Sequence, residues 1–232
     1  KTKQYKTKQY KTKQYKTKMT ESQSNANANT IFMTFVIDRS GSMYTCGYSV
    51  YDGILKCIKD KTELANNMQM DLYLSIFTFD DKIEHVDIPS NPVDLTENDY
   101  SIIKKSIMPR GWTRLYDAIN MAIEHSDAIT DNVDNRREFM IIVTDGDDNK
   151  STITNTKAKE LITEHTKKGA EYIFMGANIN AVATGSSLGI NKDSCLQFTP
   201  NAKLTTNVFN SLGLAMRRSI TTSNKVGFTE NE

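Results

Sequence analysis

The sequence predicts a three-layer, doubly wound α/β domain with a mostly parallel central sheet and one antiparallel edge strand. Continuous apolar runs, typical of strands buried on both faces, alternate along the chain with segments whose apolar residues recur at helical spacing. A short turn joins one of these runs to a segment of alternating polarity, which favours an antiparallel neighbour. The 232 residues, 38% hydrophobic and 25% charged, suffice to bury a full core.

The predicted strands follow from the apolar runs. Residues 31–37 are interrupted only by Thr34, as expected for a strand buried on both faces. Asp80 and Asp81 are a turn signal, so residues 82–88 are expected to return antiparallel to the strand before them, as an edge strand. The other strands are predicted at residues 70–79, 139–143, 172–175 and 194–199.

The predicted helices lie between the strands. Val50, Ile54 and Cys57 belong to an apolar stripe at helical spacing, and Gly169 is a typical residue to follow the end of a helix. Helices are predicted at residues 48–68, 97–107, 155–168 and 203–219, with a further helix that begins at Thr113. In sheets covered by helices on both sides, ligands bind beyond the carboxyl ends of the strands, where the strand order reverses.

The composition favours an intracellular, cytoplasmic protein that is not in a membrane. No apolar run approaches the roughly 18 residues of a membrane span, and none near the N-terminus resembles a signal peptide. Cys46, Cys57 and Cys195 are an odd and sparse set without metal-binding spacing. Such a set fits a reducing compartment better than a disulfide scaffold.

The N-terminal segment differs sharply from the rest of the chain. Residues 1–18 repeat KTKQY three times and end in KTK, which places 8 lysines and no acid there; the other residues carry 21 basic and 28 acidic side chains. We expect a disordered basic tail at 1–18, a polar linker at 19–30, the folded domain at 31–220 and a flexible C-terminal tail at 221–232.

Two interpretations of the basic tail remain open. Its lysines and tyrosines suit an electrostatic arm that binds nucleic acid, with tyrosine rings that stack on bases. A solvated tail without a role fits the composition as well. Met19, followed by a polar leader, is a plausible translation start, in which case the repeat is not part of the native protein.

Polar side chains follow two of the buried strands. DRSGSM comes after the first strand and carries Asp38, Ser40 and Ser42 on alternate positions of a tight loop. TDGDDN follows the strand that ends at residue 143 and carries Asp145, which lies beside that loop if the two strands are neighbours. Between them, GWTRLYDAI places Thr113 where a loop meets a helix.

Two carboxylates and three hydroxyls, without Cys or His, make an oxygen-only set of ligands. Such a set selects hard cations such as Mg²⁺ or Mn²⁺. Neutral hydroxyl ligands leave the charge of the ion poorly compensated, so one more anionic oxygen would bind well. A carboxylate from a partner protein can supply it.

This set of residues resembles the metal-ion-dependent adhesion site of von Willebrand factor A domains. The likeness extends to IFMGANINAVATGSSLGI and FTPNA, covers residues 31–220, and is nearest to the stand-alone intracellular members of bacteria and phages. The resemblance implies that Ser40, Ser42 and Thr113 contact the metal directly, while Asp38 and Asp145 hold it mainly through water. It also implies an Asp or Glu on the partner.

One departure from the family concerns the residue before the threonine, which is usually small. Here it is Trp112, which suits either an exposed anchor for the partner or a ring packed on the domain. Asp147 and Asp148 are expected to be solvated loop carboxylates.

The remaining titratable candidates are three histidines that occur singly on predicted surface elements. We expect His85, His125 and His165 to be structural. The function that the sequence predicts is therefore a metal-dependent protein-binding module and not an enzyme.

Enzymatic alternatives rest on less. An aspartyl-phosphate-type phosphohydrolase would use Asp145 as nucleophile and Asp147 as acid. That motif usually opens the first strand and carries Thr or Val after the second acid, whereas here it lies in the middle of the chain and Asp148 follows. An EF-hand beginning at Asp145 fails, because Lys150 stands at its sixth position and Thr156 at its twelfth. The chain has no G-x-S-x-G elbow, no phosphate-binding loop and no dinucleotide fingerprint.

Overall fold

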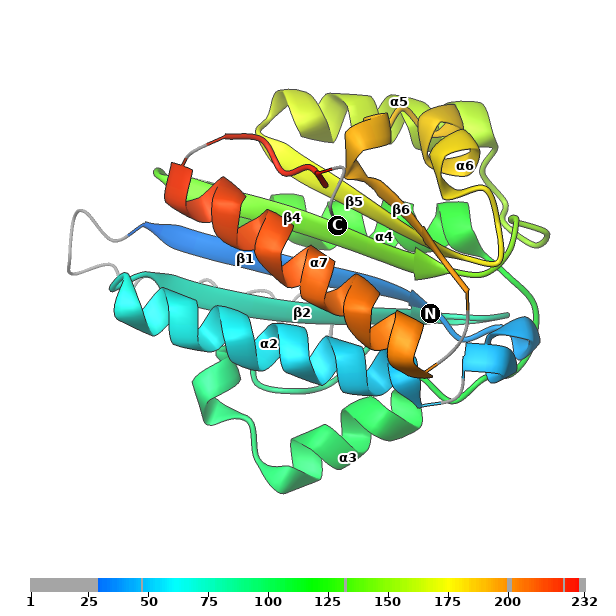
Figure 1. Cartoon of the computed structure of the whole chain (residues 1–232). Helices are drawn as coiled ribbons and strands as arrows, with labels where there is room; N and C mark the ends of the chain where they lie inside the picture. The colour runs from blue at the N-terminus through cyan, green and yellow to red at the C-terminus, as the bar shows by residue number, and fades with distance from the viewer. Residues whose placement is uncertain (1–28, 47, 132, 200–201, 223, 230–232) are drawn as a thin grey trace, which may run out of the picture.

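The computed structural model describes residues 29–46, 48–131, 133–199, 202–222 and 224–229. In this part of the chain a six-stranded sheet has the order β3-β2-β1-β4-β5-β6 (Figure 1). Only the β2–β3 pair is antiparallel, and β3 lies at the edge. The predicted fold class is therefore confirmed. The strands are β1 (Thr30–Asp38), β2 (Asp71–Phe79), β3 (Ile83–His85), β4 (Arg136–Thr144), β5 (Ala170–Ala177) and β6 (Cys195–Phe198).

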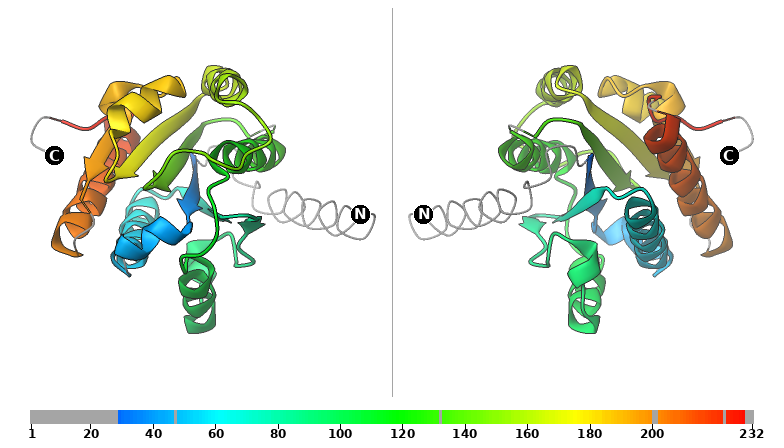
Figure 2. Two further views of the ribbon diagram at one scale, coloured as in Figure 1. Left: turned by 90° about the vertical axis from the view of Figure 1, so that its right-hand side faces the viewer. Right: turned by 90° about the vertical axis from the view of Figure 1, so that its left-hand side faces the viewer.

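Helices cover both faces of the sheet, with α2, α3 and α7 on one side and α4, α5 and α6 on the other (Figure 2). Among the described residues, no helix has the length and apolarity to span a bilayer. The helices are α2 (Ser49–Asn67), α3 (Glu97–Ser106), α4 (Leu115–Thr130), α5 (Asn155–Lys167), α6 (Ala181–Ser187) and α7 (Ala202–Thr222). Short 3₁₀ turns are η1 (Gly41–Cys46), η2 (Pro92–Asp94) and η3 (Lys192–Ser194).

The central strand β1 shows why its sequence is an unbroken apolar run. Ile31, Met33, Phe35 and Ile37 join the core formed with α2 and α7, whereas Val36 joins the core formed with α4 and α5. Every residue of β1 is buried. A strand between two helical layers has no solvent-facing side, so alternation disappears from its sequence.

Two boundaries differ from the prediction. The edge strand β3 has only three residues, fewer than the predicted 82–88. Helix α4 begins at Leu115, so Thr113 lies in the preceding loop. The first-turn amide of Tyr116 donates to Asp148 Oδ1 at 3.3 Å, so a loop some thirty residues later caps this helix.

The domain continues beyond the boundary predicted at residue 220. Helix α7 ends at Thr222, and residues 224–229 are bonded to β5 and η3: the Val226 amide donates to Glu171, and the Phe228 amide donates to the Asp193 carbonyl at 2.6 Å. Val226 is buried, and its carbonyl accepts a hydrogen bond from Ser194 Oγ at 2.8 Å. The expected flexible tail is therefore wrong for residues 224–229, because burying Val226 ties that segment down. The predicted basic tail, residues 19–28 of the linker and residues 230–232 lie outside the described residues.

The histidines are less solitary than predicted. His165 is buried on the inner face of α5, where Nδ1 lies 2.7 Å from the Tyr172 hydroxyl and Nε2 lies 2.8 Å from Glu138. The expected surface position is wrong for His165, because these polar partners allow a histidine to face the core. The rings of His85 and His125 have centroids 4.5 Å apart.

His125 leads to a prediction on pH. Burial, and secondarily the charge of His85, lowers the pKa of His125 from 6.5 to about 3. In the unfolded chain His125 is protonated below about pH 6.5, whereas in the folded domain it stays neutral until about pH 3. The free energy of unfolding should therefore decrease as the pH falls from 6.5 towards 3. Melting temperatures between pH 7 and 5 check this. His125→Gln should flatten the decline, and an unchanged slope would assign the decline to other groups.

Candidate metal centre

The candidate metal centre lies at the carboxyl edge of the sheet, where the strand order reverses. Strands β1 and β4 are adjacent and parallel, with Ile37 opposite Val143, so the residues that follow them come together. The left panel of Figure 2 looks onto this edge. Asp38 therefore reaches the loop that carries Asp145, as the sequence predicted for neighbouring strands.

Asp38 is buried and its two oxygens have different partners. Oδ1 accepts from the Ser40 amide at 2.7 Å, and Oδ2 accepts from Thr144 Oγ1 at 2.6 Å. Burial raises the pKa of Asp38 to about 6, the negative charge of Asp145 adds to the rise, and these hydrogen bonds oppose it. The carboxylate is thus held in place by its neighbours but lacks a compensating positive charge.

A chain of hydrogen bonds links the two serines to the second carboxylate. Ser40 Oγ lies 3.1 Å from Ser42 Oγ, which donates to Asp145 Oδ1 at 2.8 Å. Burial raises the pKa of Asp145 also, against the hydrogen bond from Ser42. Four of the five predicted site residues are therefore in direct contact or share a bonded neighbour.

Thr113 comes from a loop that is tied to both of the others. The Gly41 amide donates to the Gly111 carbonyl at 3.2 Å, which brings this loop alongside the serines. On the other side, the Thr113 amide donates to Asn149 Oδ1 at 3.0 Å, and the Asn149 amide returns a bond to the Thr113 carbonyl at 3.1 Å. Thr113 itself is buried.

The chemistry of these residues fits a hard divalent cation. The donors are carboxylate and hydroxyl oxygens, which Mg²⁺ and Mn²⁺ prefer. In the described part of the chain, no group of three or more His, Cys, Asp and Glu side chains is arranged to hold a metal. Two carboxylates whose pKa values are raised by burial would be stabilised by a positive charge between them.

Several supporting residues were missed by sequence reasoning. Thr144 and Asn149 bind the site residues themselves, and only their places beside Asp145 in TDGDDN could have indicated them. Asp148 was expected to be solvated, but it accepts from the Tyr116 amide and from Ser151 Oγ at 2.5 Å. That expectation is wrong, because Asp148 caps α4; Asp147 is exposed.

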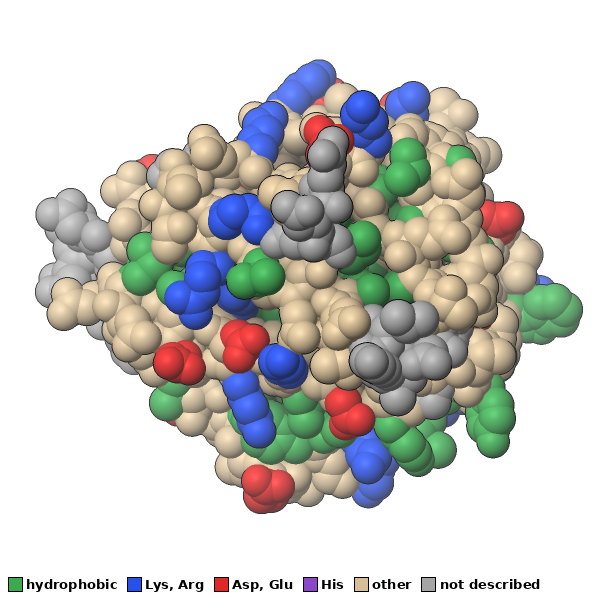
Figure 3. Space-filling model, viewed as in Figure 1, with side chains coloured by type: hydrophobic (Ala, Val, Ile, Leu, Met, Phe, Trp, Pro, Cys, Tyr) green, Lys and Arg blue, Asp and Glu red, His purple; other side chains and the backbone are tan. Residues whose placement is uncertain are grey.

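Two aromatic side chains project beside the candidate ligands. Trp112 is 60% exposed next to Thr113, and Tyr44 is 81% exposed two residues after Ser42. Of the two possibilities for Trp112, the structure shows the exposed one. In Figure 3 hydrophobic side chains protrude on the right, the side at which β1 and β4 end.

The three cysteines form no disulfide: Cys46, Cys57 and Cys195 are free and buried.

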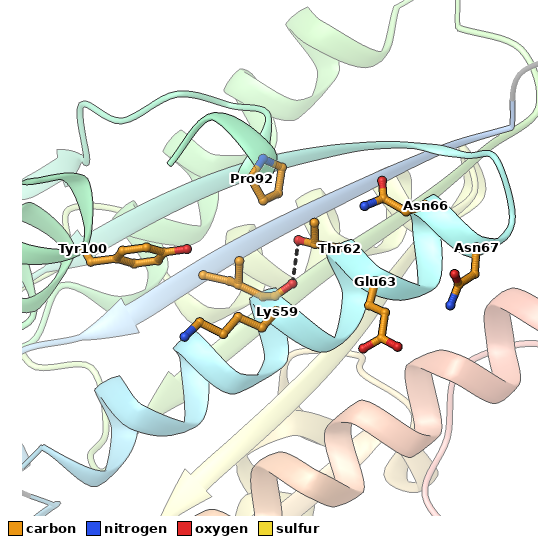
Figure 4. Close-up of a pocket in the computed structure, with 8 residues that line it drawn as sticks. Lys59, Thr62, Glu63, Asn66, Asn67, Pro92 and Tyr100 are labelled. Carbon is orange, nitrogen blue, oxygen red and sulfur yellow. Dashed lines mark hydrogen bonds between the residues drawn. The ribbon is translucent and has the colours of Figure 1, made fainter. Parts of the chain in front are cut away.

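A separate groove of about 360 Å³ lies between α2 and the segment that carries Pro92 and Tyr100 (Figure 4). Most of its lining side chains are polar and come from α2, and Thr62 Oγ1 there donates to the Ile58 carbonyl at 2.8 Å. None of the five site residues lines this groove. This groove is therefore separate from the candidate metal centre.

Fold and site together define the class: an α/β domain that carries paired carboxylates and hydroxyls at the switch point of its sheet. The chain belongs to the von Willebrand factor type A domain family, whose description matches residues 33–210. Domains of this family generally mediate metal-dependent protein interactions. A comparison with curated protein sequences finds no match.

Solved structures share the fold at low sequence identity. The vWF domain of the type V pili tip protein from Porphyromonas gingivalis has a TM-score of 0.61 and 10% identity, over 88% of this chain and 99% of that one. The von Willebrand factor type A structure from Catenulispora acidiphila has a TM-score of 0.54 and 13% identity, over 82% and 43%. Proximal thread matrix protein 1 from the mussel byssus, with a zinc-occupied MIDAS motif, has 0.55 and 13%, over 82% and 46%. This chain spans less than half of the last two.

Proposed function

We propose that this domain is a protein-binding module that captures a carboxylate of its partner through a metal-ion-dependent adhesion site. The proposed site residues are Asp38, Ser40, Ser42, Thr113 and Asp145. The observation that carries the proposal is the hydrogen-bonded chain from the buried Asp38 through the two serines to Asp145. Mg²⁺ or Mn²⁺ is the proposed ion because all the donors are oxygens.

The proposed site residues have two different roles in metal binding: some supply negative charge, and others supply neutral oxygen ligands. Asp38 and Asp145 supply the negative charge that attracts the ion, and their neighbours Thr144 and Ser42 fix where that charge lies. Ser40, Ser42 and Thr113 supply neutral oxygens. A bound divalent ion would offer a Lewis-acidic position that the partner's Asp or Glu completes.

We further propose that the protein is a stand-alone intracellular member of the family. Three free, buried cysteines support a reducing compartment, since no two of them are paired. The basic segment 1–18 gives a second contact, with nucleic acid, only if it belongs to the native protein.

The experiment that tests the function is capture of a partner with Mg²⁺ and again with chelator. Binding should require the metal and should be lost when the key partner acid is changed to its amide. A phosphatase assay on the same preparation should show no turnover. Binding that persists in chelator, or Mg²⁺-dependent hydrolysis that stops with Asp145→Asn, would contradict the proposal.

The exposed Trp112 should contribute to partner binding. Interface residues that dominate binding are enriched in tryptophan and contribute about 2 kcal/mol or more each, so Trp112→Ser should weaken partner binding roughly thirtyfold. Its effect on Mg²⁺ affinity should be slight, because the indole is not a metal ligand. Leu214→Ser on α7, a residue 52% exposed, is the control. Equal losses in both variants would mean that Trp112 has no special role.

A further inference from the structure

Arg39, between two proposed metal-site residues, is fully buried together with its charge. Its guanidinium pairs with Asp80 through Nε at 2.9 Å and with Glu84 through Nη1 at 2.7 Å. Nη1 also donates to the Ser106 carbonyl at 3.0 Å. A buried guanidinium is tolerated only with such partners, so its surroundings are expected to be rigid.

Arg110 closes this group of charges from another loop. Its Nε donates to Asp80 Oδ2 at 2.7 Å, and its Nη2 lies 3.6 Å from Glu84. Its backbone amide also donates to the Arg39 carbonyl at 2.6 Å. We call Arg39, Asp80, Glu84 and Arg110 the ion cluster. It joins the loop of Ser40 and Ser42, which we call the serine loop, to the end of β2, the edge strand β3 and the loop that leads to Thr113.

Asp80 is the centre of the cluster and is charged. Burial alone would raise its pKa, but hydrogen bonds from Arg110 and the Lys82 amide, with the charge of Arg39, hold the pKa below the ordinary value. Both arginines reach the same oxygen of this carboxylate. Removing one arginine therefore weakens the connection between two loops rather than within one.

We propose that the ion cluster is a positioning device, which holds the loop that carries Thr113 in register with the serine loop. The bond from the Gly41 amide to the Gly111 carbonyl is the contact that the cluster maintains, since Arg39 and Arg110 precede its two ends by one or two residues. None of Arg39, Asp80, Glu84 and Arg110 is among the proposed metal ligands. The inference deepens the proposed function and rests on the proposed metal centre for its consequence.

Amide hydrogen exchange in Arg110→Ala tests the device. Arg110 is 58% exposed at its side chain, so the variant should fold. Exchange at the amides of Gly41 and residue 110 should rise about five- to tenfold, as for the loss of one net hydrogen bond. Amides of β4 and β5 should keep their rates. Lys82→Ala is the control for charge on the same edge, and Arg110→Lys should restore part of the protection.

Asn149→Ala gives the matched contrast, because Asn149 holds Thr113 from the opposite side. It should speed exchange at Thr113 and leave Gly41 protected. If Arg110→Ala leaves Gly41 and residue 110 unchanged, or raises exchange equally throughout the sheet, the cluster is an ordinary stabilising group and the proposal is overturned.

Mg²⁺ affinity then separates this inference from the proposed function. If the cluster acts through Thr113, Arg110→Ala and Thr113→Ala should lower Mg²⁺ affinity by the same small factor, and the double variant should lose no more than one alone. Additive losses would overturn the positioning role. A wild-type domain that binds no Mg²⁺ would overturn the proposed metal centre, while the exchange data would still decide whether the cluster positions the loop.

Discussion

Asp145→Ala should abolish specific Mg²⁺ binding, and Asp38→Asn should do the same. The two carboxylates carry all the formal charge of the proposed ligand set, and Asp38 is buried with its oxygens held by Ser40 and Thr144. At Mg²⁺ a hundredfold above its dissociation constant, the wild-type domain should gain about 2.7 kcal/mol of stability that neither variant gains. Calorimetry and melting in Mg²⁺ measure the two effects.

The same variants should behave differently in chelator. The raised pKa of Asp38 means that its charged form is disfavoured in the folded domain, so this group costs stability above its ordinary pKa of 3.8. Asp38→Asn should therefore melt at least as high as the wild type without metal. A variant that binds Mg²⁺ normally would remove Asp38 from the site, and a large loss of stability in chelator would assign it a structural role.

Thr113→Ala should separate partner binding from metal binding. Its hydroxyl is neutral, so removing it costs little attraction for the ion itself. Under the proposed function, this hydroxyl would contact the metal directly when a partner carboxylate is bound. Partner affinity should thus fall by about tenfold to a hundredfold, as for loss of other metal-orienting groups, while Mg²⁺ affinity changes much less.

Side-by-side titrations of partner and Mg²⁺ check this expectation for Thr113→Ala and Asp145→Ala. A partner peptide with its key acid changed to the amide should reproduce the Thr113→Ala defect. Thr113→Ser, which keeps the hydroxyl, is the matched control. Normal partner binding by Thr113→Ala in Mg²⁺ would show that the partner docks on another surface.

Local sequence patterns predicted most of the fold because the core of this domain is encoded locally. The apolar run at β1 indicates a strand buried on both faces, and the turn at Asp80 indicates an antiparallel return; each signal lies within a few residues. The candidate ligands were predictable for the same reason: Asp38, Ser40 and Ser42 stand in one short loop. Because β1 and β4 are parallel neighbours, Asp145, which follows β4, lies at the same edge of the sheet as that loop.

The supporting contacts could not be predicted, because their partners are far away in the sequence. Arg39 pairs with Glu84 across 45 residues, and Asp38 bonds to Thr144 across 106. Asp148 accepts a hydrogen bond from the first turn of α4, and no helical periodicity near Leu115 can indicate this contact. His165 looks like a surface residue until Glu138 and Tyr172 are placed beside it.

The long separation between Ser42 and Asp145 has a kinetic consequence. These side chains meet although 103 residues separate them, and they do so only when β1 and β4 are paired. A contact that closes so large a loop is expected to form late in folding. Mg²⁺ should therefore slow unfolding and leave the folding rate nearly unchanged. Stopped-flow refolding and unfolding with and without Mg²⁺ would show this. The unfolding rate should fall while the folding rate stays the same, because the ion binds only after the sheet has formed and so prolongs the lifetime of the folded state.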